Sequence, residues 1–91
     1  MTGLGYMVMV SSLTAEEFAD FFGLDGARVK SWCDGKEDIS ENAEKLISEK
    51  LKLRGYALKK QVWQLDGFEE NMLFTKGVYV GVKVKASLRK V

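Results

Sequence analysis

The stretch LTAEEFADFFGLDGARVKSWCDGK, residues 13–36, determines the fold expected for this chain of 91 residues. Thr14 is a favourable N-cap residue, and Glu17 three positions later completes a capping-box pattern that begins a helix. Gly23 ends that helix, because glycine tolerates the left-handed conformation found at helix ends. The first part of the stretch therefore predicts one short helix between Thr14 and Gly23.

A second short helix follows directly in the sequence. Asp25 is positioned to cap it, since an aspartate side chain accepts hydrogen bonds from the free N–H groups of a first turn. The helix runs to about Cys33, and Gly35 is its terminator. The sequence thus predicts two short helices joined by a tight turn.

The spacing of apolar and small residues fits two helices that cross at a steep angle. Counted from Ala15, the fifth position has to be small because the second helix crosses there, and it is Ala19. The ninth position turns the chain and prefers glycine, which Gly23 supplies. The positions that meet these packing demands are Phe18, Ala19, Phe22, Gly23, Leu24, Val29 and Trp32. Because all of them agree, the pattern predicts a helix-turn-helix.

This stretch resembles the helix-turn-helix of the lambda-repressor and Cro-like family, including the aromatic Trp32 three residues before Gly35. The resemblance covers about the first half of the chain. A long helix and a small β element after the motif are also loosely similar to repressors encoded beside anti-CRISPR genes. The resemblance implies a phage or prokaryotic transcriptional regulator, a repressor that binds double-stranded DNA as a homodimer and needs no cofactor.

The resemblance also implies that the second helix, residues 25–33, lies in the major groove with its N-terminal part toward the bases. Arg28 is then the best candidate for a bidentate contact with guanine O6 and N7, while Lys30 and Ser31 reach a base or a phosphate. Lys36, just past the helix, positions the protein on the DNA backbone. The candidate DNA-binding residues are Gly26, Ala27, Arg28, Lys30, Ser31 and Lys36.

The flanking sequence predicts further helices. Apolar residues with helical spacing favour a short first helix over about 4–12, and Ser40 caps a fourth helix. Apolar positions keep helical spacing as far as Leu65, so we expect this fourth helix to be long and to end at Asp66. Gly55 leaves an earlier end open, because glycine costs about 1 kcal/mol inside a helix.

The C-terminal part changes its pattern. From Val78 the order VYVGVKVK is rich in β-branched residues and partly alternates, which predicts a strand. Residues 72–74 are its hairpin partner across a turn at 75–77. The expected fold is therefore mainly α, a bundle of four to five helices with a long fourth helix and a small C-terminal β-hairpin.

We expect a single domain over residues 1–91, since this length supports one core. The helix-turn-helix core covers about 4–54, and the remainder, about 55–91, is surplus to it. The apolar face from Leu51 to Leu65 and the Val78–Val84 strand therefore predict a dimerisation region.

Composition argues against an enzyme. The chain contains no histidine and one cysteine, Cys33, which removes the usual general base, the commonest metal ligand and any internal disulfide. A half-buried, unreactive thiol is the better interpretation of Cys33, and a reducing cytoplasm is the expected setting. The apolar run over residues 6–10 is too short to cross a bilayer, so we expect no membrane association.

Charge leaves two alternatives open. The formal net charge is +1, which does not by itself indicate a nucleic-acid partner. The basic C-terminal cluster of Lys83, Lys85, Arg89 and Lys90 either contacts phosphates or protects an exposed strand edge. The alternative function is a helix-turn-helix module that binds another protein, as an antitoxin or an inhibitor of a nucleic-acid enzyme does.

Overall fold

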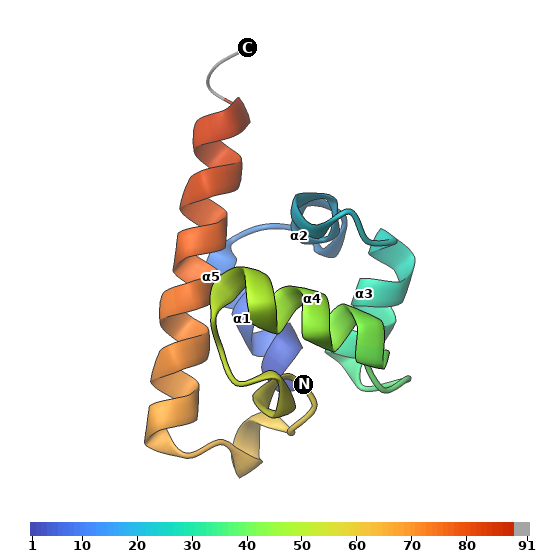
Figure 1. Cartoon of the computed structure of the whole chain (residues 1–91), viewed down its shortest axis with the longest axis vertical. Coiled ribbons are helices and arrows are strands. Elements are labelled where there is room, and N and C mark those ends of the chain that lie inside the picture. The colour runs from blue at the N-terminus through green and yellow to red at the C-terminus, as the bar shows by residue number, and fades with distance from the viewer. Residues whose placement is uncertain (89–91) are drawn as a thin grey trace.

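The computed structural model describes residues 1–88, and its ordered elements are helices. Their bounds are α1 Gly3–Ser11, α2 Ala15–Phe22, α3 Gly26–Asp34, α4 Glu41–Leu51, the 3-10 helices η1 Gly55–Leu58 and η2 Val62–Gln64, and α5 Gly67–Leu88. Figure 1 shows α5 along one side of the molecule and α3 at the opposite edge, and α1 packs against α5. The mainly α class is therefore confirmed. No helix within residues 1–88 combines the length and apolar character needed to span a membrane.

The predicted ends of α2 and α3 are confirmed, and α1 lies within one residue of its expected range. The Thr14 hydroxyl accepts a hydrogen bond from the Glu17 N–H, and the Glu17 carboxylate accepts one from the Thr14 N–H. The Asp25 carboxylate accepts the Ala27 N–H at the start of α3. Gly23 and Gly35 both adopt the left-handed conformation, at φ 71° and 76°. Local side-chain chemistry thus sets where α2 and α3 begin and end.

The prediction of a long fourth helix is wrong. Ser40 caps α4 as expected, but the helix ends at Leu51, and Lys52 turns the chain in the left-handed conformation. The chain then folds back so that η1 packs on α4, with Gly55 against the side chain of Glu44. Ending at Leu51 allows Leu58 to reach the core, where it is 1% exposed. Burial of these later apolar residues therefore overrides a continuous helix.

The prediction of a C-terminal β-hairpin is also wrong. Residues 72–74, 75–77 and 78–85 all lie within α5. Within residues 1–88 the only β pairing is a single antiparallel bridge between Thr2 and Gln61. The β-branched valines favour a strand, but propensity is a weak preference that packing overrides.

Close packing of α5 on α1 holds this segment in a helix. A Cβ atom added at Gly77 would lie 2.5 Å from the Met7 carbonyl oxygen, and one added at Gly81 would collide with the Ser11 carbonyl oxygen. The missing side chains thus let the two backbones approach each other directly. Both glycines lie on one side of α5, as residues four apart in a helix do.

One continuous apolar core joins all five α-helices. Its fully buried members come from both ends of the chain and include Leu4, Met7, Phe18, Val29, Ile47, Leu73 and Val80. Leu51 and Leu58 belong to it, so the face from Leu51 to Leu65 is not surplus to the fold. The expectation that this face is surplus to the core is therefore wrong, while dimerisation through the region 55–91 stays a prediction.

A buried carboxylate fixes the beginning of α5. Glu69 is 1% exposed, and its two oxygens lie 2.8 and 2.9 Å from the ammonium group of Lys60. Glu69 also accepts the Asp66 N–H, while the Asp66 carboxylate accepts the Glu69 N–H. The bond from the Asp66 backbone and the Lys60 ammonium hold the pKa of Glu69 below its usual value. Asp66 therefore begins α5, where the sequence had suggested that it ends the preceding helix.

The ion pair makes stability depend on pH in a defined direction. A carboxyl group whose folded-state pKa is lowered stabilises the fold above its unfolded pKa of about 4.3 and loses this effect as pH falls. Glu69→Gln is therefore expected to lower the thermal midpoint at pH 7, with the difference from the parent protein shrinking below about pH 4. Thermal unfolding followed by circular dichroism across pH 3–7 measures the thermal midpoints of both proteins and how their difference changes with pH. Glu49→Gln, at an exposed position on α4, is the control, and an equal deficit at every pH would contradict the prediction.

Candidate nucleic-acid interface

The two helices of the predicted motif form one packed unit. Val29 and Trp32 of α3 are 0% and 4% exposed, and Phe18 and Ala19 of α2 are fully buried. The turn between the helices is closed by a hydrogen bond from the Leu24 N–H to the Ala19 carbonyl. The buried side of α3 is thus fixed against the rest of the molecule, and its other side faces outward.

The outward side of α3 carries most of the candidate residues. Ala27, Arg28 and Lys30 are exposed, and Ser31 is half-buried. Lys36 is exposed just beyond the Gly35 cap. With about 100° per residue, Arg28 and Lys30 project on opposite flanks of Ala27 and Ser31.

Gly26 differs from the expectation, because it faces α2 rather than outward. A Cβ atom at this position would lie 3.0 Å from the Cα atom of Glu16. The missing side chain therefore lets the start of α3 approach the first turn of α2. Gly26 sets the separation of the two helices and offers no outward contact.

The Arg28 side chain lies along the surface of α3, over the ring of Trp32. Its guanidinium carbon is 5.5 Å from the ring centre of Trp32, one turn further on. A guanidinium over an aromatic face is a favourable cation–π arrangement. Because Trp32 is buried, this contact holds the long Arg28 side chain near the α3 surface and restricts where its donors point.

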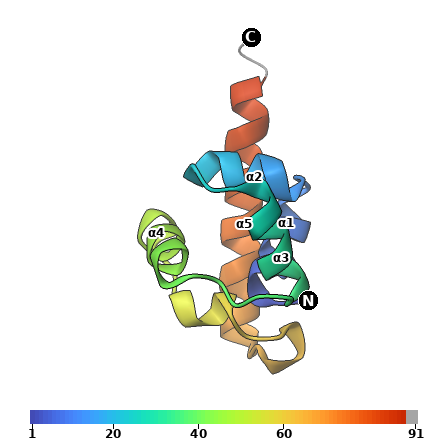
Figure 2. The ribbon, with the colours of Figure 1, turned by 90° about the vertical axis from the view of Figure 1, so that its right-hand side faces the viewer.

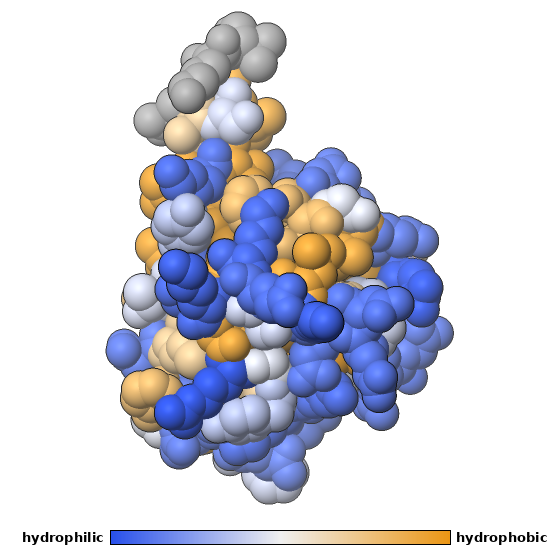
Figure 3. All heavy atoms as spheres, in the orientation of Figure 1, coloured by the Kyte–Doolittle hydropathy of each residue, from blue (hydrophilic) through white to orange (hydrophobic). Residues whose placement is uncertain are grey.

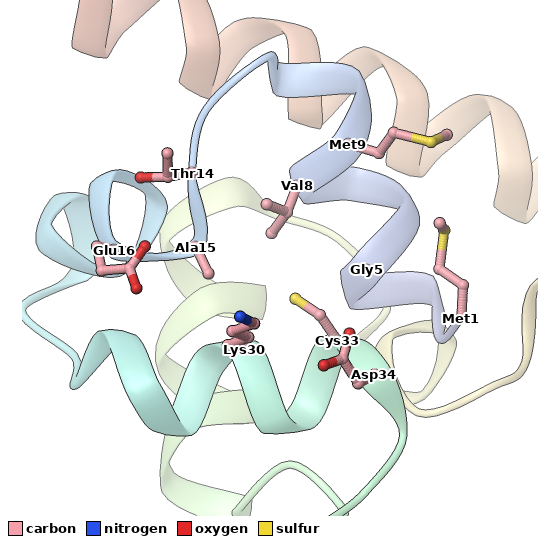
Figure 4. Close-up of a pocket in the computed structure, with 10 residues that line it drawn as sticks. All are labelled: Met1, Gly5, Val8, Met9, Thr14, Ala15, Glu16, Lys30, Cys33 and Asp34. Carbon is pink, nitrogen blue, oxygen red and sulfur yellow. The ribbon is translucent and has the colours of Figure 1, made fainter.

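Lys30 borders an open pocket of about 560 Å³ between α1, α2 and α3. Figure 4 shows Lys30 and Cys33 pointing from α3 toward Val8 of α1 and Ala15 and Glu16 of α2. The carboxylates of Glu16 and Asp34 line the same pocket. Lys30 thus leaves α3 on the side of its acidic neighbours, so the geometry favours Arg28 over Lys30 for reaching a ligand.

Cys33 is half-buried, as expected for a packing thiol. Burial, with a smaller contribution from the negative charge of Asp34, raises the pKa of the Cys33 thiol to about 11. The thiol is therefore protonated at neutral pH, and the thiolate is the reactive form. This position does not supply a nucleophile.

The charge around α3 is mixed. Residues 25–38 carry the exposed bases Arg28, Lys30 and Lys36. The same segment carries exposed acids at Asp25, Asp34, Glu37 and Asp38. Glu37 and Asp38 directly follow Lys36 in the sequence, so these acids lie beside a candidate phosphate contact. Long-range attraction to an anionic polymer is therefore weak at this surface.

The basic C-terminal cluster lies elsewhere. Lys83 and Lys85 are exposed on α5, so protection of a strand edge is not their role, and Arg89 and Lys90 lie outside the described residues. Figure 2 shows α2 and α3 toward the viewer with α5 behind them. Lys83 lines a pocket with Glu17, Asp20 and Phe21 of α2, so it lies beside α2 and not within the surface of α3.

Comparisons of the chain with models of protein families, with curated proteins and with solved structures give no match.

Proposed function

From the arrangement of α2 and α3, we propose that this protein is a sequence-specific DNA-binding regulator that places α3 in the major groove. The observation that carries the proposal is that α3 is anchored through Val29 and Trp32 while the opposite side stays exposed. A recognition helix requires this combination, because its axis has to be fixed while its outer side chains meet base edges. Repression is the proposed outcome, and it requires that the occupied operator overlaps a promoter.

The exposed side chains divide into two roles in this proposal. Arg28 projects from the first turns of α3, where its planar fork suits guanine O6 and N7. Lys36 lies past the helix end and contacts a phosphate, which positions the protein without reading sequence. Ala27 offers only a methyl group, and Ser31 a single hydroxyl, so one copy reads few bases.

Substituting Arg28 and Lys36 separately tests this division. Arg28→Ala is expected to weaken binding to the preferred duplex by about 1–3 kcal/mol and to relax selection at one base pair. Lys36→Ala is expected to weaken all duplexes alike and to lower the salt slope by about one unit. Titrations of preferred and scrambled duplexes, selected from a random pool, at two salt concentrations measure both effects.

Lys83→Ala is the matched control, since it removes the same charge from α5, which packs mainly on α1 and α2 rather than on α3. If Arg28→Ala weakened both duplexes equally, Arg28 would be a phosphate contact. If neither α3 variant changed affinity for any duplex, the DNA-binding proposal would fail.

A second candidate function is favoured by the acids around α3. Asp34, Glu37 and Asp38 repel phosphates, and a basic protein surface would instead complement them. In that case α3 presents its exposed side to a protein partner. Retention on a DNA column that falls steeply with salt supports the regulator, and no retention at low salt supports the protein partner.

A further inference from the structure

A stripe of apolar side chains runs along the side of α5 that faces away from the core. Phe74, Val78 and Val82 are 47%, 38% and 61% exposed, and their four-residue spacing places them on one side of the helix. Leu73 and Val80, on the other side, are fully buried. Figure 3 shows hydrophobic atoms along the margin of the molecule over α5. We refer to Phe74, Val78 and Val82 as the α5 stripe.

The local sequence gives α5 little tendency to be helical at this point. Residues 77–84, GVYVGVKV, consist mainly of glycines and β-branched valines, which have low helix propensity. Most helical stability in proteins comes from packing of an apolar face, and α1 and α2 pack on α5 on the side that carries Gly77, Gly81 and Val84. In Figure 1 the C-terminal turns of α5 extend beyond the other helices. A second packing partner on the α5 stripe would account for a helix here.

Charge along α5 indicates the kind of partner. Glu70 is exposed near the beginning of the stripe, and Lys85 is exposed beyond its end. Neither forms an ion pair within residues 1–88. The acidic and basic ends complement each other only if a second α5 runs in the opposite direction, because parallel helices would place like charges together.

We propose that the α5 stripe is the contact between two copies of this chain, which pair through antiparallel α5 helices. With Val78 on the two-fold axis, Phe74 of each copy faces Val82 of the other, as an isologous contact requires. Lys85 of one copy then lies beside Asn71 and Glu70 of the other. The pairing is independent of whether α3 binds DNA.

The extent of the contact indicates its strength. Standard stable interfaces bury roughly 1,200–2,000 Å², and we expect one helix from each copy to bury less than this. We therefore expect a reversible dimer with a dissociation constant in the micromolar range. The mixed charges at the two ends of the stripe fix its direction, and the apolar centre supplies its affinity.

Disulfide trapping in full-length protein carrying Cys33→Ser tests the geometry. Val78→Cys is expected to form a cross-linked dimer under mild oxidation, because this residue meets its own copy on the axis. Phe74→Cys mixed with Val82→Cys is expected to cross-link as a pair, and each alone to cross-link poorly. Ser87→Cys, exposed on another side of α5, is the control and is expected to form no disulfide cross-link. Self-linking of both Phe74→Cys and Val82→Cys without the mixed product would indicate a parallel arrangement and overturn the proposal.

Sedimentation equilibrium without DNA tests the affinity. Val78→Glu is expected to raise the dissociation constant by about tenfold or more, since it places two carboxylates together at the centre of the contact. Tyr79→Glu adds the same charge one residue away from the α5 stripe and is expected to change the dissociation constant little. Lys85→Glu is expected to weaken the dimer, and adding Glu70→Lys to restore it.

A monomer at concentrations of hundreds of micromolar, or a dimer that Val78→Glu leaves unchanged, would overturn the proposal. Circular dichroism at low concentration establishes that each variant is folded. Because no DNA is present, failure here is distinguishable from failure of DNA binding by α3.

Discussion

Gly81→Leu is expected to lower the free energy of unfolding by about 3 kcal/mol, the upper part of the usual range for overpacking. Even a Cβ atom at this position collides with the backbone of Ser11, which cannot move aside as a flexible side-chain end does. The substitution therefore forces α5 away from α1 and opens the core at Met7 and Val80. Urea unfolding of the parent and the variant, followed by far-ultraviolet circular dichroism, measures the difference.

Gly67→Ala is the matched control, because nothing lies within 4 Å of a Cβ atom at this first residue of α5. Replacing such a glycine restricts the unfolded chain, so a gain of about 0.4–1 kcal/mol is expected. A Gly81→Leu variant as stable as Gly67→Ala would show that α1 and α5 do not approach closely.

Ala19→Leu is expected to abolish specific DNA binding while costing about 1–3 kcal/mol of stability. Ala19 is fully buried in α2, where the packing pattern requires a small residue for α3 to cross. Extra volume here shifts α3, whose side chains have to meet base edges to within a fraction of an ångström. The loss of affinity therefore exceeds what partial unfolding explains.

Titration of the preferred duplex at a temperature where both proteins are fully folded separates the two effects. Ala86→Leu makes the same change at an exposed position on α5 and is expected to bind as the parent does. Normal binding by a folded Ala19→Leu variant would mean that α3 is not the recognition helix.

Local signals in the sequence were sufficient to predict where the helices of the first half of the chain begin and end. The residues that cap these helices act through hydrogen bonds and backbone conformation within a few positions, so their roles are evident from neighbouring residues. They are Thr14, Glu17, Gly23, Asp25 and Gly35. These residues set the limits of α2 and α3. The prediction succeeded where the determinants are short-range.

The second half depends on contacts between distant segments. The roles of Gly77 and Gly81 depend on the backbone of α1, which the spacing of valines does not reveal. The alternation from Val78 to Val84 therefore suggested a strand. Asp66 followed by Glu69 is itself a helix-start signal. The sequence prediction instead used Asp66 as the end of the preceding helix.

The candidate surface was predicted in outline and not in its details. The sequence indicates which side of α3 is buried, because Val29 and Trp32 are apolar. It does not show that Gly26 accommodates Glu16 or that Lys30 leaves the helix toward an acidic pocket. These details depend on how far α3 lies from α2, which only the packed structure determines.

The pairing of α1 with α5 has a consequence for how the protein folds during synthesis. The two helices come from opposite ends of the described chain, so most of the chain lies in the loop that their contact closes. Such distant contacts form late, because the entropy of closure is lost before any contact compensates it. On a ribosome, α1 emerges well before α5, and the side chains of Leu4 and Met7 then lack their cover. The nascent chain therefore exposes part of its apolar core until α5 has emerged.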